Sequence, residues 1–211
     1  MQLKIYIPQH PLINHLVNLI QSVDMPPNFV KSSIVELSYW LFYEAVRDWL
    51  DTISADLEFL DGMANVQLIN PELNLYAIPI FKSGLPMVEG ITKLLSNITL
   101  FYVSFDFNRK TIELKNSDKL LFSKLDKNSK FLIFDSIVLS SGKILALLAT
   151  LSSQGINLSS VRLIFIICTS AVLNDIGAKY PNLTVYAASV KDLKQSFQLV
   201  SYQKLQDCLF I

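Results

Sequence analysis

The sequence predicts an α/β domain whose central sheet is mostly parallel. From Leu75 onward, short apolar segments alternate with helix-forming segments, and the links between them are short. Residues 131–153 in particular have the pattern of a strand, a loop and a helix. Such alternation requires right-handed crossovers that cover both faces of the sheet with helices. A length of 211 residues suits one domain with a single core.

The first 50 residues favour an N-terminal helical segment. Pro11 suits the first turn of a helix, and apolar residues follow it at helical spacing, namely Leu12, Leu16, Leu19 and Ile20. Ser33 and Glu36 have the spacing of a capping box. This pair predicts that a second helix begins at Ser33 and runs to about Leu50.

The elements after residue 50 follow from apolar runs and turn residues. We expect strands at residues 57–60, 66–69, 75–81, 98–105, 131–135, 161–168 and 183–188. We expect a helix that follows Gly84 and runs through Leu94, and helices at residues 144–151 and 172–178. A turn at Asn108 and Arg109 would pair the strand at 98–105 with residues 111–115 as a β-hairpin arm. Residues 116–130 are polar, and we interpret them as a flexible excursion.

Composition excludes several classes of protein. Hydrophobic residues make up 51% of the chain and charged residues 17%, which indicates a folded protein. The 18 basic and 18 acidic residues balance, so we expect neither a nucleic acid nor a membrane surface as partner. No apolar run approaches the ~20 residues of a membrane span, and Pro8 and Pro11 interrupt any secretion signal.

Cysteine usage and residue bias bear on the compartment. Cys168 and Cys208 are the two cysteines, which excludes a disulfide scaffold and fits a reducing compartment. Ile, Leu, Lys, Asn and Ser are abundant beside six glycines, a bias that an AT-rich genome, including that of a plastid, can produce. We therefore expect the cytoplasm or an organelle stroma rather than secretion or a membrane.

The candidate ligand site lies where the predicted strand at 131–135 ends. Open parallel sheets bind ligands beyond the carboxyl ends of their strands. Asp135 would occupy that end, and Ser140, Ser141, Gly142 and Lys143 would open the next helix. Free amides, hydroxyls and an ammonium group favour an anion, and a carboxylate suits sugar hydroxyls or hydrated Mg²⁺. The alternative is that Asp135 and Ser140 only cap turns. The segment is not a Walker loop, because the glycine and lysine spacing of that motif is absent.

Other reactive or charged side chains have structural interpretations. His10 and His15 are too few for a histidine-rich metal site, so we assign them structural or interface roles. Cys168 lies in an apolar run and is interpreted as inert packing. We assign Glu44, Arg47 and Asp48 to an ion-pair cluster on a helix surface. We assign Trp40 and Trp49 to the core or to an interface.

Five collinear segments resemble the uracil phosphoribosyltransferase family. His10-Pro11-Leu12 with His15 is similar to its N-terminal motif, and Tyr43-Glu44-Ala45-Val46-Arg47-Asp48 to its Y-E-A-T-R-D. Residues 77–90 resemble V-P-I-L-R-A-G-L-G-M-V-D-G, and residues 134–143 resemble V-D-P-M-L-A-T-G-G-S, the ribose-phosphate loop. Residues 180–188 resemble H-P-D-V-x-I-Y-T-A-A.

The resemblance implies a type I phosphoribosyltransferase fold and a reaction. Members of the family join uracil to 5-phosphoribosyl 1-diphosphate (PRPP), usually with Mg²⁺, to give UMP and diphosphate in pyrimidine salvage. Oligomers are common, so a homo-oligomer is expected. The positions that the resemblance assigns to PRPP binding are Lys82, Asp135, Ser140, Ser141, Gly142 and Lys143.

The chain departs from the family pattern in three loops. Lys82 stands where the family has a diphosphate-loop arginine, and a second family arginine falls near Tyr102. Ser141 replaces a glycine, and Lys143 replaces a serine and could compensate by its charge. In the tail, residues 191–211, no glycine remains of the family's uracil loop, so no uracil-binding residue can be named.

These departures predict a homologue whose activity is weak or lost and for which uracil is a doubtful ligand. Two alternatives stay open: an active uracil phosphoribosyltransferase, and a non-catalytic metabolite sensor or oligomer partner that binds PRPP or another phosphorylated sugar. An RNA-binding regulator is disfavoured by the neutral charge balance. We treat the chain as one domain with N-terminal helices in residues 1–50, an α/β core in residues 75–190 and a degenerate base-binding tail.

Overall fold

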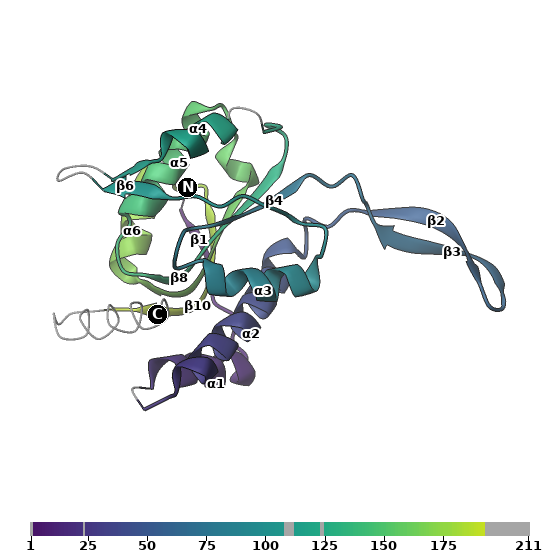
Figure 1. Cartoon of the computed structure of the whole chain (residues 1–211), viewed down its shortest axis with the longest axis horizontal. Helices are drawn as coiled ribbons and strands as arrows, with labels where there is room; N and C mark the ends of the chain where they lie inside the picture. Colours follow the sequence, from purple (N-terminus) through teal and green to yellow (C-terminus); the bar gives the residue numbers. More distant parts are fainter. Residues whose placement is uncertain (1, 23, 108–111, 123–124, 193–211) are drawn as a thin grey trace.

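The computed structural model describes residues 2–22, 24–107, 112–122 and 125–192. A six-stranded sheet forms its centre, and every strand pairing in it is parallel (Figure 1). In order across the sheet the strands are β1 (Lys4–Tyr6), β10 (Thr184–Lys191), β9 (Val161–Thr169), β8 (Lys130–Val138), β4 (Leu75–Pro79) and β5 (Thr99–Leu100). The α/β architecture predicted from the alternation of segments is confirmed; β1, a short edge strand, was not expected.

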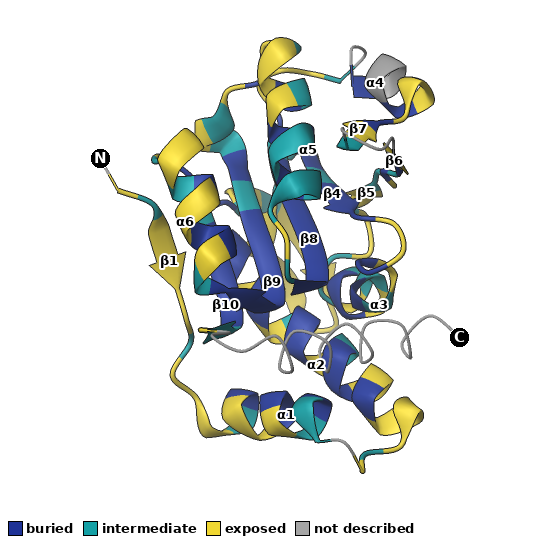
Figure 2. Ribbon diagram, turned by 90° about the vertical axis from the view of Figure 1, so that its left-hand side faces the viewer, coloured by how far each residue is buried: buried dark blue, intermediate teal, exposed yellow. Residues whose placement is uncertain are grey.

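Helices cover the two faces of the sheet. On one face lie α1 (Pro11–Gln21), α2 (Pro27–Val46) and α3 (Leu85–Leu94), which share a core with sheet residues such as Phe134 and Ile164. On the other lie α5 (Gly142–Ser153) and α6 (Ser170–Lys179). Along the chain, the 3₁₀ turn η1 (Leu158–Ser160) lies between α5 and β9. Figure 2 shows α5 and α6 in front of the buried strands. Strands buried on both faces explain the continuous apolar runs of the sequence.

The second helix begins earlier than the capping box indicated. Pro27 occupies its first turn, where the missing amide hydrogen costs nothing. Ser33 is the seventh residue of α2, and its Oγ donates a hydrogen bond of 2.8 Å to the carbonyl oxygen of Phe29. The prediction of a start at Ser33 and an end near Leu50 is therefore wrong, because a serine hydroxyl inside a helix can bond four residues back instead of capping.

A long hairpin projects from the body of the molecule (Figure 1). It consists of β2 (Thr52–Phe59) and β3 (Gly62–Ile69), which pair antiparallel over their whole length. Gly62, with φ +126°, supplies the backbone conformation of the turn that other residues rarely adopt. The two short strands expected here are in fact each eight residues long.

One face of this hairpin is apolar. Directly opposed residues share a face, and the pairs Ile53–Leu68, Ala55–Val66, Leu57–Ala64 and Phe59–Gly62 form one side. We call this side the apolar face of the hairpin. Its larger side chains stay exposed, with 45% of Phe59 and 41% of Leu68 accessible. Within the described part of the chain, the apolar side chains on this face of the hairpin therefore remain accessible to solvent.

Residues 98–130 differ most from the sequence prediction. The single strand expected at 98–105 is divided into β5 and β6 (Phe105–Phe107), and β6 pairs antiparallel with β7 (Ile112–Leu114) as the predicted short hairpin. The predicted turn at Asn108 and Arg109 lies outside the described residues. The polar stretch contains a helix, α4 (Asn116–Phe122), rather than only a flexible excursion.

Tertiary contacts stabilise α4. Its Asp118 is buried and accepts a hydrogen bond of 2.8 Å from the backbone amide of Ser104. Phe122 is also buried, and its ring lies 4.8 Å from that of Phe101. These partners lie outside the segment itself, so its own polarity could not reveal the helix.

The segment Tyr43–Asp48 ties α2 to the amino end of β9. Arg162 donates two hydrogen bonds to the Asp48 carboxylate, at 2.6 and 2.8 Å, and one of 2.6 Å to the carbonyl oxygen of Ala45. Its guanidinium group lies 4.0 Å from the centre of the Trp49 ring. The surface ion pair predicted between Glu44 and Arg47 is present at 3.6 Å. Asp48 does not belong to that pair, because Arg162 engages its carboxylate.

Among the described residues no helix has both the length and the apolar character that a membrane span requires.

Candidate functional site

The carboxyl ends of β4 and β8 bring two predicted loops together. The amide of Ile80, just after β4, donates a hydrogen bond of 3.1 Å to the carbonyl oxygen of Phe134. The amide of Ser136 donates one of 3.3 Å to the carbonyl oxygen of Ser83. The loop that carries Lys82 therefore lies directly beside the Asp135 segment, as the site prediction requires; the peptide bond between Phe81 and Lys82 is cis.

Gly84 explains why this loop can approach β8 so closely. A Cβ atom at this position would lie 2.7 Å from the carbonyl oxygen of Phe134 and 2.8 Å from the backbone nitrogen of Ile80. Both are backbone atoms that cannot turn away. Glycine is thus required for close packing here, and it fixes the position of Ser83 against β8.

Asp135 lies within β8 and not at its end. The strand continues to Val138, and Asp135 is in register with Phe165 of β9, so the predicted strand end at Asp135 is wrong. Alternation along β8 places the Asp135 side chain on the same face as Ile133, the face that α5 and α6 cover. Only 3% of the residue is exposed. The apolar run before Asp135 predicted the strand but not its full length, because pairing with β9 continues the strand to Val138.

The environment of Asp135 leaves its carboxyl group incompletely paired. Its Oδ1 atom has no hydrogen-bond partner in the protein, and neither do the buried hydroxyl oxygens of Ser83 and Ser136. Burial raises the pKa of Asp135 to about 7, while the nearby Ser83 hydroxyl and the positive charge of Lys143 oppose the increase. Ser83 is thus close enough to favour the carboxylate, but not in the geometry of a hydrogen bond. Unpaired buried polar atoms are rare. Those of Ser83, Asp135 and Ser136 come from two adjoining segments, and two others among the described residues, on Gln21 and Ser129, lie elsewhere.

The predicted anion-binding residues surround the start of α5. Ser140 is exposed, and its Oγ accepts a long hydrogen bond of 3.5 Å from the amide of Gly142. A Cβ atom on Gly142 would lie 2.6 Å from Cδ1 of Ile112, because β7 packs against this turn. The helix that the sequence predicted to open at these residues is confirmed, with Ser141 as its N-cap.

Ser141 is already engaged by a carboxylate. Its Oγ donates a hydrogen bond of 2.7 Å to Oδ2 of Asp175, which lies on α6. Neither Asp175 nor Ser83 was predicted from the sequence to belong to this region. No local signal could have indicated Asp175, since 34 residues separate it from Ser141.

The position assigned to a lost arginine lies beside the Lys82 loop. The amide of Phe81 donates a hydrogen bond of 2.9 Å to the carbonyl oxygen of Val103, and Ile80 and Val103 form a parallel bridge. Tyr102 therefore borders this loop, and 48% of it is exposed. Lys82 is exposed as well. The cationic groups that the structure describes here are lysines, which lack the two-pronged donor geometry of arginine.

Two further sequence candidates have structural roles. Cys168 is buried in β9, and burial raises the pKa of its thiol to about 12, so the interpretation as inert packing is confirmed. His10 caps α1, since its Nδ1 accepts a hydrogen bond of 3.2 Å from the amide of Leu12. After β9, Thr169 caps α6, because its Oγ1 accepts a hydrogen bond of 3.2 Å from the amide of Val172.

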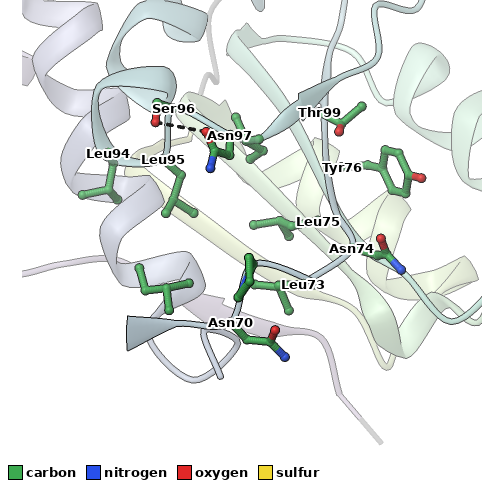
Figure 3. Close-up of a pocket in the computed structure, with 13 residues that line it drawn as sticks. Asn70, Leu73, Asn74, Leu75, Tyr76, Leu94, Leu95, Ser96, Asn97 and Thr99 are labelled. Carbon is green, nitrogen blue, oxygen red and sulfur yellow. Dashed lines mark hydrogen bonds between the residues drawn. The ribbon is translucent and has the colours of Figure 1, made fainter. Parts of the chain in front are cut away.

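Two pockets lined by described residues lie away from Asp135. One of about 270 Å³ is found at the amino ends of β4 and β5, and Leu73, Asn74, Leu95 and Thr99 contribute to its lining (Figure 3). Since β4 runs away from this pocket toward Pro79, it is at the opposite edge of the sheet from Asp135. Another, of about 500 Å³, lies between α2 and α3. Neither includes a residue of the predicted ligand site.

Comparison with known proteins gives consistent matches. The family model for uracil phosphoribosyltransferase matches residues 7–201. A uracil phosphoribosyltransferase from Synechococcus elongatus is 30% identical over 191 residues, which are 90% of this chain and 88% of the relative. A uracil phosphoribosyltransferase homolog from Porphyra purpurea is 26% identical over 210 residues and covers 100% of both chains.

Solved structures share the fold. A protein from Aquifex aeolicus superposes with a TM-score of 0.80 at 20% identity, over 98% of this chain and 97% of its own. An adenine phosphoribosyltransferase from Trypanosoma brucei, solved with AMP, pyrophosphate and ribose-5-phosphate, gives 0.52 at 12% identity, over 88% and 83%. The fold is that of the type I phosphoribosyltransferases.

Proposed function

Because the chain belongs to the uracil phosphoribosyltransferase family, we propose that it binds a phosphorylated ribose such as PRPP and transfers the ribosyl group to uracil weakly or not at all. The observation that supports ligand binding is the unpartnered Oδ1 of Asp135, buried beside Ser83 and near the charge of Lys143. A carboxyl oxygen without a partner is costly unless a ligand or water satisfies it. The observation that supports weak transfer is the absence of arginine at Lys82 and Tyr102.

The proposed roles follow the chemistry of the side chains. Asp135 accepts hydrogen bonds from ribose hydroxyls, and the amides and hydroxyls at Ser140, Ser141 and Gly142 hold the 5-phosphate with the charge of Lys143. Lys82, on the adjoining loop, contacts the diphosphate. Since Asp135 is 3% exposed, a sugar reaches its Oδ1 only after the side chains around it move apart.

Mg²⁺ fits this site as an ion that enters with its ligand. No three His, Cys, Asp or Glu side chains group as a metal cage within the described part of the chain. Magnesium commonly takes one or two carboxylates and completes its shell with phosphate oxygens and water. The Asp135 carboxylate is an oxygen ligand of this kind, and the ion would neutralise charge on the leaving diphosphate.

The weak transfer that we propose follows from the leaving group. In this reaction positive charge develops on the sugar while diphosphate departs, so cationic donors aimed at the diphosphate carry much of the catalysis. An arginine binds phosphate through two parallel hydrogen bonds, which lysine and tyrosine cannot form. Each lost contact would cost on the order of 10²-fold in rate. Loss of the glycines in the tail, which lies mostly outside the described residues, would also weaken uracil recognition.

A homo-oligomer is part of the same proposal. The apolar face of the hairpin projects from the body and stays exposed on the side chains of Ile53, Leu57, Phe59 and Leu68. Contiguous exposed apolar surface of this kind is typical of protein interfaces. A second copy of the chain is the occupant that we propose, in keeping with the oligomers common in the family. For the compartment we propose cytoplasm or organelle stroma, which suits the two cysteines.

Calorimetric titration tests the binding part of the proposal. PRPP with Mg²⁺ should bind, and uracil added afterwards should give little or no response. Failure of PRPP and ribose 5-phosphate to bind would contradict the proposal and favour a purely structural role as an oligomer partner. A salt-sensitive RNA complex would instead revive the RNA-binding alternative.

A rate assay tests the catalytic part. Formation of UMP from uracil, PRPP and Mg²⁺ should be at least 10²-fold below ordinary enzyme rates. UMP formation at ordinary rates would establish the active-enzyme alternative. PRPP binding with no turnover would support the sensor form of the proposal.

A further inference from the structure

The contact between Ser141 and Asp175 places a carboxylate where an anionic ligand is expected. Ser141 is the N-cap of α5, and its hydroxyl donates to Asp175 Oδ2 at 2.7 Å. A hydroxyl has a single proton, so Ser141 cannot donate to a phosphate oxygen while it donates to Asp175. The hydroxyl that Ser141 introduces in place of the family's glycine is thus already used in a hydrogen bond to Asp175.

We propose that Asp175 is a negative determinant of phosphate affinity: its carboxylate competes with the 5-phosphate of a ribose ligand for the Ser141 hydroxyl and repels that phosphate. The inference rests on the proposed function, since it concerns the same ribose-phosphate site. It adds a residue from α6 to a site otherwise built from β4, β8 and α5.

Charge makes this competition effective. The positive end of the α5 dipole and its free amides attract anions within the first turn. A carboxylate within hydrogen-bond distance of the N-cap side chain uses part of that attraction for itself. Within the described residues Asp175 forms no ion pair that would neutralise it. A phosphate that arrives there meets a like charge at close range, and the repulsion is of a size to change affinity about tenfold.

The alternative is that Asp175 only ties α6 to the start of α5. Two substitutions separate these roles. Asp175→Asn keeps an oxygen that can accept from Ser141 but removes the charge, whereas Asp175→Ala removes both. If Asp175 only linked α6 to α5 through this hydrogen bond, Asp175→Asn would leave phosphate affinity unchanged, and only Asp175→Ala would lower stability.

Asp56 provides a matched control. It is exposed, on the hairpin far from the site, and accepts one hydrogen bond of 2.7 Å from the neutral side chain of Asn65. Asp56→Asn therefore changes the net charge of the chain as Asp175→Asn does, without altering the start of α5.

The experiment is a calorimetric titration of the full chain and its variants with ribose 5-phosphate and with PRPP and Mg²⁺. At about 10 mM salt Asp175→Asn should bind ribose 5-phosphate roughly tenfold more tightly than the parent, and Asp56→Asn should equal the parent. At about 1 M salt the gain should shrink, because charges in water are then screened within ~3 Å. Binding of unphosphorylated ribose should not improve.

Each outcome decides between the proposals. Equal, measurable affinity of the parent and Asp175→Asn would overturn the role of Asp175 and leave the proposed function standing. No binding by either protein would overturn both. Binding by Asp175→Asn alone would support the role of Asp175 but contradict the proposed binding of phosphorylated ribose by the parent chain, whose site would be blocked by its own carboxylate.

Discussion

Arg162 at the start of β9 binds both carboxylate oxygens of Asp48, at 2.6 and 2.8 Å, across a separation of 114 residues. The arginine is 11% exposed and the aspartate 67%. The hydrogen bond from Arg162 is the main cause that lowers the pKa of Asp48. This pair, with the Trp49 ring below the guanidinium, joins the helical segment to the sheet.

The first prediction concerns this joint. Arg162→Ala should lower the free energy of unfolding by about 2 kcal/mol or more, since it removes two charge-assisted hydrogen bonds, one backbone contact and the stacking on Trp49. The matched control is Arg47→Ala, because the exposed 3.6 Å pair with Glu44 should contribute less than about 0.5 kcal/mol. Urea unfolding measures both, and equal effects would contradict the assignment.

A second prediction uses the pKa of Asp135. Its value of about 7 in the folded protein exceeds the unfolded value of ~3.9, so the folded state binds more protons between these pH values. Asp135 therefore favours folding below about pH 4, and this contribution is lost as pH rises toward 7, by on the order of 4 kcal/mol. The stability of Asp135→Asn minus that of the parent should thus increase between pH 4 and 7. A flat difference curve would show that the carboxyl group is not buried as described.

Lys143 provides a third prediction. Lys143→Ala should weaken ribose 5-phosphate binding about threefold to tenfold, because it removes a positive charge from the first turn of α5. Lys179→Ala, at the opposite end of α6 from its N-cap, is the control and should bind as the parent does. Calorimetry at low salt distinguishes them; unaltered affinity in Lys143→Ala would remove this residue from the proposed phosphate site.

The fourth prediction concerns Gly84. Gly84→Ala places a Cβ atom 2.7 Å from a backbone carbonyl, so it should cost about 2–4 kcal/mol of stability. Gly177→Ala is the matched substitution. Gly177 lies within α6, and a Cβ atom there would meet Cβ of Leu3 at 3.4 Å, an ordinary contact distance. It should be neutral or stabilise by up to about 1 kcal/mol. Thermal unfolding of the two variants would refute the packing argument if the order were reversed.

A fifth prediction addresses the hairpin. Leu57→Asp puts a charge on its apolar face and should dissociate a homo-oligomer, while Ser54→Asp adds the same charge on the opposite face and should not. Sedimentation velocity measures the oligomeric state of each. A parent chain that sediments as a monomer at micromolar concentration would rule out the interface.

The sequence predicted what neighbouring residues encode. The strand, loop and helix of residues 131–153 follow from an apolar run and a turn rich in small residues, and the structure has them as β8 and α5. Pro11 marked the start of α1 in the same way. The helix α4 and the start of α2 were missed, because Asp118 and Ser33 bond to groups that local patterns do not single out.

What the sequence by itself determined is the family, the parallel α/β order and the identity of the polar residues at the start of α5. The tertiary structure alone decided that Asp135 is buried, that the Ser141 hydroxyl donates to Asp175, and that the apolar face of the hairpin is exposed in the described part of the chain. The physical reason is range. Periodicity and caps act over a few adjacent residues, whereas burial and hydrogen-bond partners depend on segments that only folding brings together.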